Sequence, residues 1–195
     1  MQKKLKIKTI FVLGGPGSGK GTLCKKLKEF FNCEHLSCGD ILRNIVDKKE
    51  YKNWKNIENK VNSGGFLKPQ EMVELIKYEY NNLSKSNIIF LDGFPRIKEN
   101  DEEWYKTMTE ISDIIGVLYL ECSKETMKKR ILERKDIRND KDISTIEKRI
   151  SHFYEQTIPI IDEYTKKNLT IKISSEQDIE EVFKEAINKL KTLIY

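Results

Sequence analysis

Short apolar runs alternate along the chain with stretches in which apolar residues recur every three or four positions. The short runs are rich in Ile, Val, Leu and Phe, as is typical of buried strands, and they cover residues 6–13, 88–91, 114–120 and 169–173. The periodic stretches predict amphipathic helices over residues 20–31, 69–80, 145–164 and 177–193. Strands that alternate with helices indicate an α/β fold built on a parallel sheet.

Polar residues suggest where some helices begin. Asp40 is a candidate N-cap for a short helix over residues 41–46, because its carboxylate can accept from free helix amides. Ser144 and Glu147 have the spacing of a capping box in front of the long helix. Pro159 lies inside that helix and should distort it, because proline has no amide hydrogen to donate.

Two segments do not follow the strand–helix alternation. Residues 39–68 are polar and helical, and residues 134–142 are almost wholly charged. We therefore expect two excursions from one sheet, and a single domain over residues 1–195.

A glycine-rich turn follows the first predicted strand and opens the first predicted helix. It reads GGPGSGKGT from Gly14 to Thr22 and contains the GxxxxGK spacing of a P-loop. Glycines let successive backbone amides turn inward around an anion, and the helix start adds a positive dipole end. The turn predicts an ATP-binding site made of Gly15, Pro16, Gly17, Ser18, Gly19, Lys20, Gly21 and Thr22.

Composition narrows the classes of protein to which the chain can belong. The chain has 195 residues with 36 basic and 31 acidic side chains, a net charge of +5 that suits an anionic substrate. The apolar runs are too short for a membrane span or a signal peptide. The four cysteines form no CxxC pair, so we expect free thiols, no zinc site and a cytoplasmic protein, with the nucleus as an alternative.

The sequence also bears on three other functions: a GTPase switch, an ATP-binding switch without turnover, and nucleic-acid binding. The guanine-binding motif of a GTPase switch, NKxD, is missing. A nucleotide-gated switch that binds ATP without turnover remains an alternative. The chain has no aromatic-basic module of the kind that binds RNA, so we expect no specific nucleic-acid partner.

Five motifs together resemble the adenylate kinase family of nucleoside monophosphate kinases. Besides the P-loop they are LSCGDILR at residues 36–43, FLDGFPR at 90–96, RILER at 130–134 and EKRI at 147–150. The resemblance implies a P-loop fold whose five-stranded parallel sheet carries helices on both faces. It also implies a monophosphate-binding helical insert at about 37–67, a short lid at about 134–142, and a monomer.

The resemblance further implies roles for individual residues. The catalytic set would be Lys20, Arg96, Arg134, Arg138 and Arg149, since several arginines are needed to bind two polyanions. Arg134 and Gln177 would contact ATP, and Asp92 would hold Mg²⁺ through water, with Thr22 as a second candidate. The monophosphate site would comprise Ser37, Gly39, Arg43, Gly65, Phe66, Leu67, Gly93, Phe94, Arg96, Asn100, Arg138 and Arg149.

The acceptor base is suggested by the residue four positions after Arg96. Adenylate kinases usually have Gln there, whereas this chain has Asn100 and resembles the UMP/CMP kinases. An amide offers both a donor and an acceptor, so it can address uracil and cytosine. We expect transfer of the γ-phosphoryl group of ATP to UMP or CMP, with dCMP as a further acceptor; the alternative is AMP as acceptor.

Overall fold

A five-stranded parallel sheet forms the centre of the molecule, as the sequence predicts. The computed structural model describes residues 5–49, 51–83, 87–133 and 142–195, and within these ranges the strand order is β2-β3-β1-β4-β5. All neighbouring strands pair in parallel. Their bounds are β1 Ile7–Gly14, β2 Glu34–Ser37, β3 Ile88–Asp92, β4 Ser112–Glu121 and β5 Thr170–Ser174.

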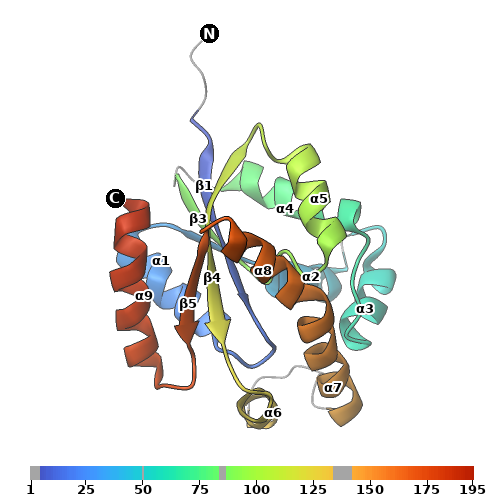
Figure 1. The fold of residues 1–195 in the computed structure, drawn as a ribbon. Helices are drawn as coiled ribbons and strands as arrows, with labels where there is room; N and C mark the ends of the chain where they lie inside the picture. The colour runs from blue at the N-terminus through green and yellow to red at the C-terminus, as the bar shows by residue number, and fades with distance from the viewer. Residues whose placement is uncertain (1–4, 50, 84–86, 134–141) are drawn as a thin grey trace.

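Helices cover both faces of the sheet, also as predicted (Figure 1). One face packs against α1 (Lys20–Phe31) and α9 (Ile179–Ile194). The other packs against α4 (Pro69–Asn82), α5 (Lys98–Thr107) and α8 (Ile158–Lys166). This arrangement leaves uncovered the end of the sheet at which the strands have their carboxyl termini, and α/β sheets bind ligands at that end.

The alternation of side chains along β1 explains the two cores. Ile10 and Val12 point toward α1 and α9, whereas Phe11 and Leu13 point to the opposite face. The Phe11 ring meets the Trp104 ring of α5 edge-on, with ring centroids 5.2 Å apart. All four β1 side chains are buried, and each such burial contributes roughly 1.5–3 kcal/mol to stability.

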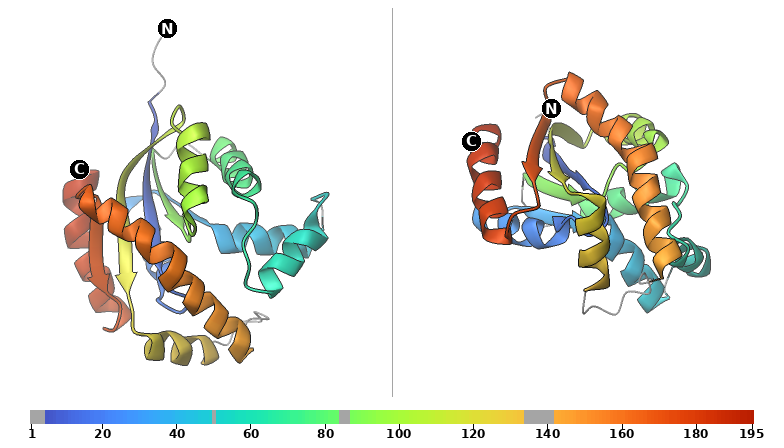
Figure 2. Two further views of the ribbon diagram at one scale, coloured as in Figure 1. Left: turned by 45° about the vertical axis from the view of Figure 1, so that its right-hand side comes forward. Right: turned by 60° about the horizontal axis from the view of Figure 1, so that its bottom comes forward.

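Two pairs of helices lie beyond this end of the sheet. The predicted insert contains α2 (Cys38–Lys48) and α3 (Trp54–Asn62), which extend away from the sheet in the left view of Figure 2. The helices α6 (Lys124–Leu132) and α7 (Ile143–His152) flank the predicted lid. Residues 134–141 of that lid lie outside the residues that the structure describes.

Two helix starts differ from the sequence expectation. Ser37, not Asp40, caps the first helix of the insert: the Ser37 hydroxyl accepts from the Asp40 amide at 3.3 Å, so α2 begins at residue 38. Similarly, Asp142 rather than Ser144 caps α7, because its carboxylate accepts from the Thr145 amide at 3.0 Å. In each case the true cap is the residue that still has extended backbone, which sequence spacing alone does not reveal.

The predicted distortion near Pro159 is present. The helix expected over residues 145–164 consists of α7, a five-residue π-helical turn over Phe153–Thr157, and α8. Pro159 has no amide hydrogen for the usual bond four residues back, so the helix adopts a wider turn just before it.

Candidate functional site

The P-loop joins β1 to α1 at the carboxyl end of the central strand. Gly17 has a φ of +83° in this turn, and a Cβ there would lie 2.7 Å from the Met127 carbonyl oxygen. Only glycine therefore satisfies both the backbone angle and the close approach of α6. The local sequence thus fixes a loop whose amides and helix start face the open end of the sheet.

Lys20 is held above this loop. Its ammonium nitrogen donates hydrogen bonds to the carbonyl oxygens of Gly14 at 2.8 Å and Gly15 at 2.9 Å, and to the Ser18 hydroxyl at 3.3 Å. A full positive charge therefore lies beside the amides and can reach an anion that they bind.

A cavity of about 490 Å³ opens beside the P-loop. Its walls come from the P-loop, the insert, the end of β3 and the region around α7. Most of the predicted site residues line it: Pro16, Gly17, Gly19, Lys20, Gly21, Thr22, Ser37, Gly39, Arg43, Gly65, Phe66, Leu67, Asp92, Gly93, Arg96 and Arg149.

Charge in this cavity is strongly positive. Among the described residues that line it, the acidic ones are Asp40 and Asp92, and the basic ones are Lys20, Lys25, Arg43, Lys60, Arg96 and Arg149. Such an excess of cations in a concave site favours a ligand with several negative charges.

The three described arginines predicted to bind phosphate come from separate parts of the chain. Arg96 follows β3 and donates through Nε to the Gly93 carbonyl oxygen at 2.8 Å. Arg43 lies on α2 and pairs with Asp40. Arg149 lies on α7 and donates to the Val61 carbonyl oxygen at 3.0 Å. The fold thus directs guanidinium groups from three elements into one space.

A small pocket of about 30 Å³ adjoins the cavity and shares several of its residues. Asn100, Phe94 and Met72 line this pocket. The Asn100 side-chain oxygen Oδ1 accepts from the backbone amides of Arg96 at 3.3 Å and Ile97 at 3.4 Å. It therefore caps α5, and its fixed side chain borders the pocket at the same time.

Cys38 forms part of the wall of the small pocket. Burial raises the pKa of its thiol to about 12, so the group is neutral at pH 7. A neutral, buried thiol acts as a small apolar wall and not as a nucleophile.

Asp92 ends β3 and lies next to the P-loop helix. Its carboxylate oxygen Oδ2 would be 3.6 Å from a Cβ added at Gly21, and its side chain is 9% exposed. A carboxylate that lines the cavity beside Lys20 and Thr22 suits a hard cation with oxygen ligands, such as Mg²⁺ carried by a nucleotide.

Some predicted residues are not in the cavity wall. Gly15 and Ser18 are buried within the loop, and Gln177, in the segment before α9, lines neither cavity. Arg134 and Arg138 lie outside the residues that the structure describes.

The structure adds residues that sequence reasoning missed. The cavity is also lined by Lys25, Lys60, Val61, Gly64, His152, Phe153 and Thr157. The Phe66 and His152 rings lie 5.0 Å apart, which joins the insert to the end of α7. Gly64 belongs to a Gly-Gly pair visible in the sequence, but no local pattern marks the others, because α3 and α7 meet only in the folded chain.

Comparisons with known proteins agree with this geometry. The family model described as Adenylate kinase matches residues 12–169. UMP-CMP kinase 3 of Oryza sativa subsp. japonica is 38% identical over 180 residues, which cover 92% of this chain and 84% of the relative. UMP-CMP kinases of Mus musculus and Homo sapiens are 35% and 34% identical over 184 residues, covering 91% of this chain and 94% of each relative.

No helix in the described part of the chain combines the length and the apolar character needed to cross a membrane.

Proposed function

The chain belongs to the adenylate kinase family, and from that premise we propose that it transfers the γ-phosphoryl group of ATP to UMP or CMP. The products are ADP and UDP or CDP, and dCMP is a further acceptor. The observation that carries the proposal is one cavity in which a P-loop, three arginines and an amide-bordered pocket meet.

The P-loop side of the cavity would bind ATP. Backbone amides and the start of α1 would hold its phosphates, and Lys20 would stabilise the charge that develops on the transferred group. Thr22 lines the same wall. We also propose that Arg134 and Gln177 contact ATP, as the family resemblance implies.

The opposite side of the cavity would bind the acceptor. Arg43 and Arg96 would grip its phosphate, and Arg149 would contact the transferring group and the acceptor phosphate together. Arg138 is proposed to assist. The base would lie where the cavity meets the small pocket, between Leu67 and Asn100 and next to Phe94 and Phe66.

Phosphoryl transfer is mainly a matter of position and charge. Bound to ATP, Mg²⁺ would neutralise charge on the phosphate oxygens. Asp92 would hold its water ligands, because the carboxylate ends β3 at the wall of the cavity. The six basic side chains would bring two anionic substrates together. Closure of the insert and the lid would exclude water as the acceptor.

The proposal also assigns residue bounds to the monophosphate-binding insert and to the lid. Residues 37–67, with α2 and α3, would form the monophosphate-binding insert, because they supply one wall of the cavity. Residues 134–142 would form a short lid over ATP. We also propose that the protein acts as a monomer, as the family resemblance implies.

The four cysteines support a reducing compartment. Cys24, Cys33, Cys38 and Cys122 are free and buried. Thiols of this kind persist where disulfides do not form, and we therefore propose the cytoplasm.

A panel of acceptors tests the function. Purified protein, ATP and Mg²⁺ are combined with UMP, CMP, dCMP or AMP at equal concentration, and ADP release is measured. We expect UMP and CMP to give the highest kcat/KM. A preference for AMP of about 10-fold would contradict pyrimidine specificity. ATP binding without turnover on any acceptor would instead support a nucleotide-gated switch.

A further inference from the structure

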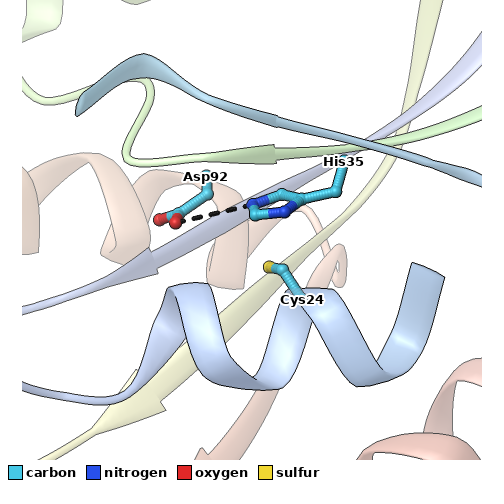
Figure 3. A group of neighbouring side chains, drawn as sticks. All are labelled: Cys24, His35 and Asp92. Carbon is cyan, nitrogen blue, oxygen red and sulfur yellow. Dashed lines mark ion pairs between the residues drawn. The ribbon is translucent and has the colours of Figure 1, made fainter. Parts of the chain in front are cut away.

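A cysteine, a histidine and an aspartate from three separate elements meet beside the phosphate cavity. Cys24 lies on α1, His35 on β2, and Asp92 at the end of β3. Their potential ligand atoms, a thiol sulfur, an imidazole nitrogen and a carboxylate oxygen, all lie within 4.8 Å of one another. Figure 3 shows the three side chains pointing toward one another.

The fold brings these residues together for a simple geometric reason. In the register of β2 and β3, Ser37 pairs with Asp92 and His35 pairs with Phe90. Side chains two residues apart share a face, so His35 and Asp92 lie on the face that carries Phe90 and α1. Cys24 follows Lys20 by one helical turn and points from α1 toward that face.

The imidazole in this group is buried and incompletely satisfied. The His35 side chain is 8% exposed, and among the described residues none forms a hydrogen bond with its Nε2 atom. Asp92 Oδ2 lies 3.7 Å from Nε2, which is longer than a hydrogen bond. A buried polar atom without a partner carries a desolvation cost that a ligand at this point would remove.

The donor set indicates what kind of ligand fits. Ligands bound at about 2.0–2.1 Å to a tetrahedral Zn²⁺ lie roughly 3.3 Å apart, so the Nε2–Oδ2 separation needs little adjustment. Sulfur and nitrogen donors favour Zn²⁺ over Mg²⁺, which prefers oxygen. Three protein ligands also leave one position open, as in zinc sites that bind water or a substrate.

Contrary to the expectation of no zinc site from the cysteine spacing, we propose that Cys24, His35 and Asp92 form a binding site for Zn²⁺ or a similar thiophilic divalent cation. The cation enters from the cavity, since Asp92 lines it. As the metal–sulfur bond forms, the Cys24 thiol releases its proton to solvent.

The site has a consequence for the reaction. Asp92 is the carboxylate proposed to hold the water ligands of Mg²⁺, so Zn²⁺ at this position withdraws it from that role. The cation is therefore an inhibitor that competes for one side chain. This consequence rests on the proposed function, whereas binding itself does not.

Zn²⁺ titration calorimetry tests the binding, with metal-stripped protein and without nucleotide. Wild type, Cys24→Ser and His35→Gln are compared with Cys122→Ser, which removes a buried thiol that lies outside this group. We expect one Zn²⁺ per chain, with binding at least about 10-fold weaker in the first two variants and unchanged in the control. Thermal melts monitored by circular dichroism verify that each variant folds.

Co²⁺ provides a second readout that does not depend on stability or activity. Thiolate coordination produces a sulfur-to-metal charge-transfer band, which we expect in wild type and in Cys122→Ser but not in Cys24→Ser. Absence of the band in wild type, or equal Zn²⁺ affinity in all four proteins, would overturn the proposed site.

The inhibitory consequence is tested separately. Within each protein, turnover with ATP, Mg²⁺ and UMP is divided by turnover with added Zn²⁺, and we expect a larger ratio in wild type than in His35→Gln. Equal ratios alongside site-specific Zn²⁺ binding would overturn the competition for Asp92. Failure of the proposed function itself would appear as absent turnover before any Zn²⁺ is added.

Discussion

The Arg149 guanidinium donates a hydrogen bond to the Val61 carbonyl oxygen at 3.0 Å, although 88 residues separate the two in the chain. This bond connects α7 to α3, the helix of the insert that ends at Asn62. Gly64 permits the approach, because a Cβ there would lie 3.2 Å from the Arg149 side chain. A cation is thereby placed between the two walls of the cavity that would have to close around the substrates.

The planar guanidinium group of Arg149 should matter for turnover beyond the positive charge that it carries. Arg149→Lys retains the positive charge but loses the planar arrangement of donors that binds two phosphate oxygens at once. We expect kcat to fall by about 10–100-fold with little change in melting temperature, measured by steady-state kinetics and circular dichroism. The reverse exchange on the exposed neighbour, Lys148→Arg, is the control and should leave kcat unchanged. Equal kcat in wild type and Arg149→Lys would remove Arg149 from the proposed machinery.

Lys20 should contribute to turnover rather than to folding. Its ammonium group bonds to the loop carbonyls and lies at the cavity wall, so Lys20→Ala removes charge stabilisation of the transferring group. We expect kcat to fall at least about 10²-fold. Lys184→Ala, on the exposed side of α9, should retain full activity. A Lys20→Ala protein with normal turnover would refute the proposed role of the P-loop.

The sequence was sufficient to predict features that depend on short-range spacing. The P-loop of Gly14–Thr22 combines a strand, glycines and a helix start within nine residues, so its shape follows from local chemistry. Arg96 was predicted for a similar reason, because it comes four residues after the end of a buried strand. Strand ends of a parallel sheet gather at one edge, and both features therefore meet there.

Features that depend on long-range packing were missed. Strand β2 has four residues of mixed polarity, so it shows no apolar run, and its His35 was not considered. Helix α5 is highly charged, and its apolar contact with the core relies largely on Trp104. Val61 enters the site through its backbone carbonyl, a group that every residue possesses and that no sequence pattern marks.

Asn100 should determine which acceptor is preferred. The residue is 4% exposed, and its side-chain oxygen Oδ1 is fixed by the backbone amides of Arg96 and Ile97, beside the small pocket. Asn100→Gln adds one methylene, which shifts the amide into the pocket. We expect kcat/KM for UMP and CMP to fall by about 10-fold or more, while AMP is affected less. The acceptor panel measures this directly.

The capping role of Asn100 provides the competing explanation. A loss of the same size for every acceptor, together with a lower melting temperature, would assign the residue to the start of α5 alone. Glu99→Gln is a matched control on the exposed side of the same helix turn and should leave the acceptor preference unchanged.

Glu176 should make stability depend on pH in the acid range. Its carboxylate accepts from the Ser123 amide at 2.6 Å and from the Thr126 hydroxyl at 2.7 Å, at the start of α6. The hydrogen bond from the Ser123 backbone N–H is the largest cause of the shift of the Glu176 pKa from 4.5 down to about 2. Because the folded-state pKa is the lower one, the stabilising contribution is complete above pH 4.5 and is lost as pH falls toward 2.

Replacement of this carboxylate by an amide separates its charge from its shape. Glu176→Gln keeps one acceptor oxygen but removes the negative charge, which strengthens the hydrogen bonds that the side chain accepts at the start of α6. We expect a lower melting temperature than wild type at pH 7, with the difference shrinking steadily as pH falls below 4.5. The effect should be small because Glu176 is exposed to solvent, which screens its charge. Glu110→Gln, an exposed carboxylate outside α6, should show no such convergence, and parallel melting curves for wild type and Glu176→Gln across this range would contradict the assignment.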